Sequence, residues 1–348
     1  MQYTISLLPG DGIGPELTDA TLRVLSAAQR KCDLDLKIVE YEAGDECYRK
    51  NQVPLPDETV KGIRNSHACL KGPIGETSAD VVVKLRIMLD LYAGIRPIKS
   101  YPNVPSFRKD IDLVLVRENT EDVFKRIEFM LDDTAIALRV ITRKGCERIA
   151  KKAFELASTR NRARKVTAVH KSNVMKVTCG LFAETCREVA KAYPNINYEE
   201  LYVDAAAMML IREPQNFDVI VTTNMFGDIL SDEAAQLIGG LGMAPGANIG
   251  DGNIALFEPV HGCAPTLVGK HTANPCSMIF AAKMMLEWLG QQHNDPICTN
   301  ASNEIEKGIA EVLSKQLTVP DLGGTLRTVE MGEAIAKEIL RQPLAQYR

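Results

Sequence analysis

The amino-acid sequence predicts an α/β protein built on a parallel sheet. Up to Lys71 the chain alternates apolar, β-branched segments with amphipathic ones, in the order strand, helix, strand, helix, strand. This order is typical of a parallel sheet covered by helices. A length of 348 residues with 45% hydrophobic residues can bury a large core and indicates about two domains. The five expected elements are Tyr3–Pro9, Leu17–Lys31, Leu36–Tyr41, Asp57–Asn65 and His67–Lys71.

Strand and helix patterns continue through the rest of the chain. The segment Ala79–Tyr92 has helical spacing and carries Arg86, and prolines at 97, 102 and 105 then indicate a crossing into a second domain. Further strands are expected at Ile111–Val116, Ala135–Thr142, Lys165–His170 and Asp218–Thr223, and further helices at Arg143–Thr159, Cys179–Tyr193, Ala205–Arg212 and Pro275–Leu289.

Composition excludes several classes of function. A formal charge of -4 and a pI near 5.9, without a Lys/Arg block, argue against nucleic acid as a partner. The start lacks the pattern of a signal peptide, and the longest uncharged run is too rich in glycine for a membrane span. Nine cysteines without a C-x-x-C pair fit a reducing cytoplasm rather than a disulfide framework or a zinc site.

Two glycine- and acid-containing turns are candidates for ligand binding. Gly10–Gly14, GDGIG, joins the first strand to a helix, but it is one residue short of the dinucleotide fingerprint G-x-G-x-x-G. In the second, the chain turns at Asn224–Gly227 into a helix with Asp228 and Asp232 on one face. Carboxylates at this spacing repel each other, which a bound cation would relieve; a solvated acidic helix start is the alternative.

Charged residues follow several of the predicted strands. Because α/β sheets bind ligands at the carboxyl ends of their strands, these residues mark a candidate site. Three arginines, Arg86, Arg96 and Arg117, suit a substrate with more than one carboxylate, because guanidinium groups bind carboxylates in a bidentate way. Surface ion pairs are the alternative for any one of them. The other charged residues of this group are Lys171, Asp204, Asp228 and Asp232.

Nine sequence signatures, in order along essentially the whole chain, resemble those of the β-decarboxylating dehydrogenases, which include isocitrate, homoisocitrate and 3-isopropylmalate dehydrogenases. They are LLPGDGIGPE, LDLYAGIRP, VRENTED, AVHKSNVMK, DVIVTTNMFGDILSDEAA, ANIGDG, FEPVHGCAP, ANP and PDLGG. The resemblance implies a non-Rossmann, two-domain α/β fold with a cleft between the domains. It places residues 1–95 and 240–348 in a large, cofactor-binding domain and residues 96–239 in a small domain for dimerisation, metal and substrate.

The resemblance also implies the chemistry and its residues. A nicotinamide cofactor oxidises a 2-hydroxy acid, which then loses its β-carboxylate as carbon dioxide. Asp228 and Asp232 bind Mg²⁺ or Mn²⁺, and Asp204 joins them from the partner subunit, which implies a homodimer with shared active sites. Lys171 accepts the hydroxyl proton, and Arg86, Arg96 and Arg117 hold the substrate carboxylates. The cofactor is held by a loop with His261, Gly262, Ala264, Thr266 and Asn274, and Glu76 approaches the nicotinamide.

Two positions depart from the family pattern. Phe124 stands where the family usually has the tyrosine that protonates the enol carbon, and phenylalanine has no proton to give. Thr266 stands where NAD-specific members carry an aspartate, while no lysine for a 2′-phosphate follows. The absent cation favours NAD, with NADP as the alternative.

The substrate is predicted from the residues before Leu85. The family reads the group on the third substrate carbon there, and this chain presents Val81, Val82 and Val83. Burying an unpaired carboxylate on valines would cost several kcal/mol, whereas an isopropyl group gains roughly 1.5 to 3 kcal/mol from burial. Val82 and Val83 therefore favour 3-isopropylmalate and a step of leucine biosynthesis. Isocitrate or homoisocitrate is the alternative substrate, and a catalytically weak regulatory subunit is an alternative of another class.

Overall fold

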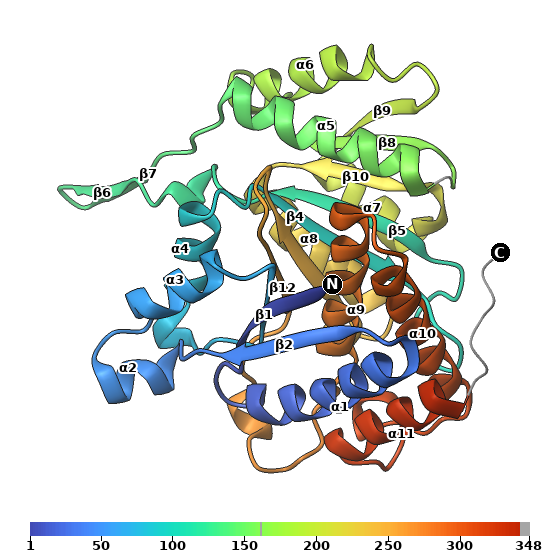
Figure 1. Ribbon diagram of the computed structural model, residues 1–348. Helices are drawn as coiled ribbons and strands as arrows, with labels where there is room; N and C mark the ends of the chain where they lie inside the picture. The colour runs from blue at the N-terminus through green and yellow to red at the C-terminus, as the bar shows by residue number, and fades with distance from the viewer. Residues whose placement is uncertain (161, 342–348) are drawn as a thin grey trace.

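A computed structural model of the chain describes residues 1–160 and 162–341. Its centre is a ten-stranded sheet in the order β2-β1-β3-β12-β11-β4-β5-β10-β8-β9, and a separate two-stranded sheet pairs β6 with β7 (Figure 1). The strands are β1 (Gln2–Leu8), β2 (Asp35–Glu40), β3 (Ala68–Lys71), β4 (Ala93–Lys99), β5 (Asp112–Glu118), β6 (Glu128–Leu131), β7 (Thr134–Ala137), β8 (Lys165–His170), β9 (Asn197–Tyr202), β10 (Val219–Thr222), β11 (Pro245–Ile249) and β12 (Ala255–Pro259).

The sheet is parallel at both ends and antiparallel in the middle. β1 lies parallel to β2 and β3, which confirms the parallel arrangement expected from the first 71 residues. β5, β10, β8 and β9 form a second parallel set. Between the two sets, β11 runs antiparallel to β12 and β4, and β4 runs antiparallel to β5. One sheet therefore connects the two halves of the molecule.

Helices cover both halves of the sheet. α1, α9, α10 and α11 pack together beside the β1 half, whereas α5 and α6 pack together beside β8 (Figure 1). The helices are α1 (Gly14–Cys32), α2 (Asp45–Asn51), α3 (Asp57–Arg64), α4 (Asp80–Met88), α5 (Arg143–Arg160), α6 (Thr178–Ala190), α7 (Val203–Arg212), α8 (Asn224–Leu237), α9 (Cys276–His293), α10 (Pro296–Ser314) and α11 (Thr328–Arg341). Among the described residues, no helix is long and apolar enough to cross a membrane.

Several expected elements differ in the structure. The strand predicted at Ala135–Thr142 is confirmed only at its start, because β7 covers Thr134–Ala137. It forms an exposed hairpin with β6 instead of joining the main sheet. The turn predicted at Asn224–Gly227 is wrong, since α8 begins at Asn224 itself. The helix predicted at Ala79–Tyr92 ends at Met88, because Asp90 takes a left-handed conformation (φ 48°) before β4 begins.

The predicted domain boundary, between residues 95 and 96, falls inside β4. This strand pairs with β11 through Ala93–Ile95 and with β5 along its whole length. The division into domains 1–95 with 240–348 and 96–239 stays a prediction, and β4 is the strand at which the two parts meet. All nine cysteines are free, and seven of them are buried.

Candidate active site

A buried carboxylate, that of Glu258, gathers three cations. It lies in β12 and is 4% exposed. Lys71 Nζ lies 3.0 Å from Oε2, and Arg86 Nη2 donates to Oε1 at 2.9 Å. Arg96 Nη2 lies 3.7 Å from Oε1. Burial alone would raise the pKa of Glu258, but Lys71, Arg86 and Arg96 outweigh it and hold that pKa well below its usual range.

The register of the sheet explains why these groups meet. Glu258 pairs with Gly246 of β11, and a Cβ at position 246 would lie 2.0 Å from Arg96 Nη1, so glycine there makes room for the guanidinium. Asn248, also on β11, donates to Glu258 Oε1 at 2.8 Å. The Nε and Nη1 atoms of Arg96 are buried without a hydrogen-bond partner in the described residues. Buried, unpartnered guanidinium donors indicate a site prepared for an anion.

Arg117, at the end of β5, extends this positive region toward α8. Its Nε and Nη2 donate to Asn224 Oδ1 at 2.9 and 2.7 Å, and its Nη1 forms an ion pair with Asp228. A Cβ at Gly227 would lie 2.7 Å from Arg117 Cγ, which explains the glycine in the first turn of α8. Burial, together with Arg86 and Arg96, lowers the pKa of Arg117 to about 9. The three predicted arginines therefore form one electrostatically coupled group.

Asp228 and Asp232 project from successive turns of α8 into exposed positions. Desolvation and repulsion from Asp228 raise the pKa of Asp232, an effect partly offset by Arg96 and Arg117. This mutual repulsion is the property expected of a carboxylate pair that shares a hard cation, and oxygen ligands suit Mg²⁺ or Mn²⁺. Within residues 1–160 and 162–341, no group of three or more His, Cys, Asp or Glu side chains is placed to hold a metal, so Asp204 of the same chain does not complete the pair.

Lys171 and Asp204 form a second charged pair. Lys171 follows β8, Asp204 lies in the first turn of α7, and Lys171 Nζ is 2.6 Å from Asp204 Oδ1. The hydrogen bond from Lys171 lowers the pKa of Asp204. The ring of Tyr202 lies 5.7 Å from Lys171 Nζ. The structure therefore brings the two residues expected to act in catalysis together, with Asp204 largely exposed.

The three valines of α4 lie in different surroundings. Val81 is fully buried in the core beneath α4, so at least one valine serves packing. Val82 and Val83 are partly exposed, on the helix that also carries the buried Arg86. Phe124 is also near the arginines, because the Arg117 guanidinium lies 5.1 Å from the centre of its ring. This cation–π contact occupies the aromatic face without offering a proton.

The loop predicted to hold the cofactor packs against the GDGIG turn. Ile13 N donates to Cys263 O at 3.1 Å, and a Cβ at Gly12 would lie 2.1 Å from that oxygen. Asp11 accepts hydrogen bonds from the backbone N–H groups of Asp45, Glu46 and Gly75, so it anchors α2 and the segment before Glu76. The turn thus holds α2, the segment before Glu76 and the predicted cofactor loop together.

The predicted cofactor residues differ in exposure. His261 Nδ1 lies 2.9 Å from Gly262 O, and burial lowers the pKa of the imidazole. Asn274 is buried and donates to Asp321 Oδ2 at 3.1 Å, so its amide is already held. Ala264 takes a left-handed conformation, φ 41°. Gly262, Thr266 and Glu76 are exposed.

Comparison with known proteins assigns the family. Residues 4–335 match the model of isocitrate/isopropylmalate dehydrogenases. The chain belongs to this family. Among its relatives is a protein of Methanocaldococcus jannaschii named 3-isopropylmalate/3-methylmalate dehydrogenase, 49% identical over 341 residues, which cover 97% of this chain and 99% of the relative. An isocitrate/homoisocitrate dehydrogenase of Thermus thermophilus is 45% identical over 345 residues, or 97% of this chain and 99% of that relative.

Two solved structures share the fold. Isocitrate dehydrogenase from Methylococcus capsulatus has a TM-score of 0.90 and 43% identity, and the match covers 97% of this chain and all of that one. The TT0538 protein from Thermus thermophilus has a TM-score of 0.89 and 39% identity, over 99% of this chain and 69% of that chain. The predicted family and fold class are therefore confirmed.

Sequence reasoning about this family member missed the centre of the arginine cluster. Glu258 belongs to the signature FEPVHGCAP, yet only His261, Gly262 and Ala264 of that segment were predicted to bind a ligand. A signal was present, since a lone acid between Phe257 and Pro259 in an otherwise apolar strand has to find a partner when it is buried. Lys71, at the end of the buried strand β3, offered the same signal. Their pairing depends on strand order, which no local pattern shows.

Proposed function

We propose that the protein catalyses the metal-dependent oxidative decarboxylation of 3-isopropylmalate to 2-oxoisocaproate, with NAD as the cofactor. The observation that carries this proposal is the coupled group of Arg86, Arg96 and Arg117 beside the Asp228–Asp232 pair. Three guanidinium groups from different elements suit a dicarboxylate substrate. Relatives named for 3-isopropylmalate are 46 to 49% identical to the chain, which supports the same substrate.

The reaction divides into two steps. In the first, the C2–H bond breaks and its hydrogen leaves as a hydride, for which a bound nicotinamide would be the acceptor, while Lys171 takes the hydroxyl proton, directly or through a water. In the second, the C–C bond to the β-carboxylate breaks, carbon dioxide leaves, and the electron pair remains as an enolate that is then protonated on carbon. A divalent cation held by Asp228 and Asp232 would acidify the hydroxyl and stabilise the enolate. The arginines orient the two carboxylates, so the reacting bonds keep a fixed geometry.

The geometry of the second pair supports a shared active site. Lys171 and Asp204 hold each other, and Asp204 stays apart from the Asp228–Asp232 pair in its own chain. Large apolar side chains are exposed on the neighbouring helices α7 and α8 and on the β6–β7 hairpin, which projects from the molecule (Figure 1). Exposed apolar side chains of this kind are typical of an interface between subunits. We therefore propose a homodimer in which Lys171 and Asp204 of one subunit complete the other's site. The exposed apolar residues are Phe129, Met130, Leu131, Met208, Ile211, Met225 and Ile229.

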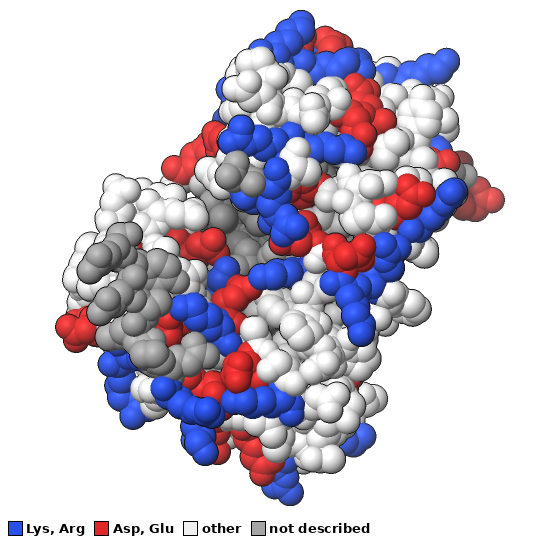
Figure 2. Space-filling view, turned by 90° about the vertical axis from the view of Figure 1, so that its right-hand side faces the viewer, with Lys and Arg blue, Asp and Glu red and all other residues white. Residues whose placement is uncertain are grey.

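The mixed surface charge supports an enzyme that acts on small-molecule substrates rather than a protein that binds nucleic acid. On the face drawn in Figure 2, acidic and basic side chains are interspersed and form no single basic field. The formal charge of -4 agrees with this distribution. Nine free cysteines fit a reducing compartment, so we place the enzyme in the cytoplasm.

The preference for NAD rests on Thr266. This residue is exposed in the cofactor loop, where it offers a hydroxyl but no cation for a 2′-phosphate. The nearest lysine along the chain is Lys270, four residues further on. NADP is therefore expected to bind less tightly than NAD, although no carboxylate at 266 repels it.

An absorbance assay of nicotinamide reduction tests the proposal. Purified protein with Mg²⁺ is given 3-isopropylmalate, isocitrate or homoisocitrate, each with NAD and with NADP. We expect kcat/KM to be highest for 3-isopropylmalate with NAD. A higher kcat/KM for isocitrate would reject the substrate, and substrate binding without turnover would identify a regulatory subunit instead.

A further inference from the structure

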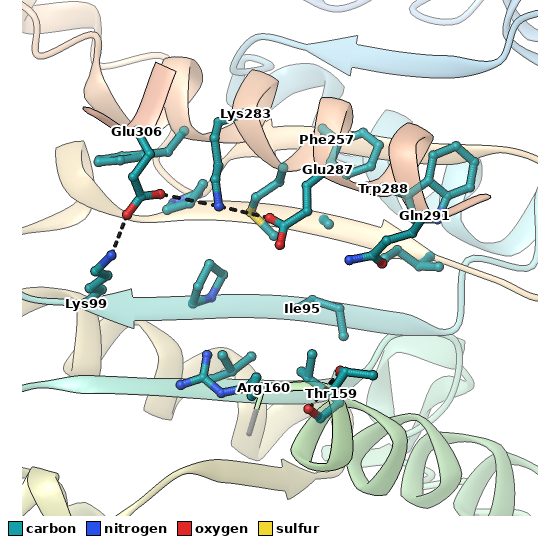
Figure 3. A pocket seen from close by; sticks show the side chains of 18 of the residues that line it. Ile95, Lys99, Thr159, Arg160, Phe257, Lys283, Glu287, Trp288, Gln291 and Glu306 are labelled. Carbon is teal, nitrogen blue, oxygen red and sulfur yellow. Dashed lines mark hydrogen bonds and ion pairs between the residues drawn. The ribbon is translucent and has the colours of Figure 1, made fainter. Parts of the chain in front are cut away.

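A cavity lies on the face of the sheet opposite the arginine cluster. It has a volume of about 650 Å³ and opens between α9 and α5 (Figure 3). Strand alternation separates it from the active site, because successive side chains of a strand point to opposite faces. On β4, Ile95 lines the cavity while Arg96 binds Glu258; on β12, Phe257 lines it while Glu258 faces the arginines. The cavity is therefore distinct from the catalytic site.

The floor of the cavity is apolar. Phe257 pairs with Ala247, and Ala247 pairs with Ile95, so these three side chains cross the sheet in one row. Met284 and Phe280 of α9 border the same space. A ligand that fills this region has to carry an apolar group of some length. A wholly polar molecule would lose its hydrogen bonds to water against these apolar side chains and gain none in return.

The rim of the cavity is charged but electrically balanced. Lys283 Nζ of α9 lies 2.9 Å from Glu287 Oε2 and 3.3 Å from Glu306 Oε2. Burial alone would lower the pKa of Lys283, but these two carboxylates outweigh it and raise that pKa. Glu306 also pairs with Lys99 (Figure 3). Across the opening, the cations of α5 are paired in the same way: Lys152 with Glu155, and Arg160 with Asp112.

This balance selects the charge of the ligand. The lining holds four cations and four carboxylates: Lys99, Lys152, Arg160 and Lys283 against Asp112, Glu155, Glu287 and Glu306. A ligand with only a negative charge would be repelled by the carboxylates, and a ligand with only a positive charge would be repelled by the lysines and the arginine. A zwitterion can place its carboxylate on Lys283 and its ammonium on Glu287, so each ion pair is replaced by another and no charge is left buried alone.

A buried donor at the apolar end gives independent support. Trp288, one turn after Met284 on α9, is 6% exposed and borders the cavity, and its indole Nε1 has no hydrogen-bond partner in the described part of the chain. Buried donors of this kind are uncommon without a ligand or a water. Gln291 lies one turn further along the same face and brings an amide to the same end (Figure 3).

We propose that this cavity is a second small-molecule site that binds a zwitterionic α-amino acid with an apolar side chain. The ammonium and carboxylate groups bind at Glu287 and Lys283, and the side chain lies on the row of Ile95, Ala247 and Phe257. The site is independent of the dehydrogenase reaction, so binding can be tested without substrate or cofactor.

Trp288 provides the measurement, because it is the single tryptophan of the chain. The intact protein is titrated with L-norleucine, its intrinsic fluorescence is recorded, and calorimetry is run in parallel. We expect a saturable change with a matching heat. Hexanoate lacks the ammonium, pentylamine lacks the carboxylate and L-alanine lacks the long apolar arm, so each is expected to bind at least about tenfold more weakly. The absence of saturable binding, or equal binding of hexanoate, would overturn the proposal.

Three variants locate the site. Glu287→Gln removes the negative charge that pairs with the ammonium and is expected to weaken L-norleucine binding about tenfold. Thr159→Arg fills the cavity from α5, whose exposed Thr159 borders it, and is expected to abolish binding. The matched control, Glu184→Gln, changes an exposed, ion-paired glutamate of α6 and is expected to leave binding unchanged. Thermal melts show whether each variant folds. Because there are two independent cavity variants, the test remains possible if one of them does not fold. Undiminished binding in both folded cavity variants would contradict the assignment.

Discussion

Replacing Glu258 with glutamine isolates the contribution of the buried carboxylate that holds Lys71, Arg86 and Arg96. The change keeps the shape of the side chain and an oxygen to accept from Asn248, but it removes the negative charge. Three buried cations would then face one another without a counter-ion. Removing one partner of a buried ion pair costs roughly 3 to 5 kcal/mol, so we expect the free energy of unfolding at pH 7 to fall by about that amount.

Urea denaturation followed by circular dichroism measures this loss. Glu184→Gln serves as the control, because Glu184 is exposed and pairs with Arg143 at the surface. An exposed pair contributes little, so the control should match the wild type within error. A Glu258→Gln variant as stable as that control would refute the role given to the buried carboxylate.

The same pair of proteins tests the pH dependence. The pKa of Glu258 is lowered by folding, so its charge stabilises the protein above the unfolded pKa of about 4.3, and this contribution is lost as the pH falls toward the folded pKa. The stability difference between wild type and Glu258→Gln should therefore be constant from pH 7 to about pH 5 and narrow progressively below about pH 4. A difference that stays constant below pH 4 would show that folding does not lower the pKa of Glu258.

Three further changes test the active site. Asp232→Asn removes one carboxylate of the proposed metal pair and should raise the Mg²⁺ or Mn²⁺ concentration needed for half-maximal activity at least about tenfold, measured by metal titration; an unchanged metal requirement would exclude Asp232 as a ligand. Val83→Arg adds a cation where the substrate's third carbon is read, so kcat/KM should shift toward homoisocitrate and away from 3-isopropylmalate, and an unchanged ratio would place Val83 outside the site. Phe124→Tyr restores a proton donor beside Arg117 and should increase the rate at which the keto acid is released; no gain in turnover would mean that another group or water already supplies the proton.

Local patterns in the sequence were sufficient for those parts of the fold that depend on neighbouring residues. Apolar periodicity predicted β1, β2 and β3 with their helices, and the i,i+4 spacing predicted that Asp228 and Asp232 share a helix. For the exposed β6–β7 hairpin, the sequence predicted a strand that overlaps β7 but neither β6 nor the pairing, because the hairpin buries no face against the core. Contacts between segments that are distant in the sequence could not be predicted from these local patterns either.

The cluster around Glu258 shows this limit most clearly. Lys71, Arg86 and Glu258 come from β3, α4 and β12, and they meet because β12 pairs with β3 across the sheet. Nothing within the segment around any one of these residues encodes that pairing. Resemblance to a family supplied the list of acting residues, whereas the structure supplied the carboxylate that holds two of the three arginines in place.

The stoichiometry of a single reaction tests the central claim most directly. Purified protein is incubated with 3-isopropylmalate, NAD and Mg²⁺, and reduced nicotinamide and released carbon dioxide are measured in the same sample. Oxidative decarboxylation predicts one carbon dioxide for each nicotinamide reduced, and neither product when Mg²⁺ is replaced by a chelator. Nicotinamide reduction without carbon dioxide, or no reaction with 3-isopropylmalate at all, would contradict the function proposed for this chain.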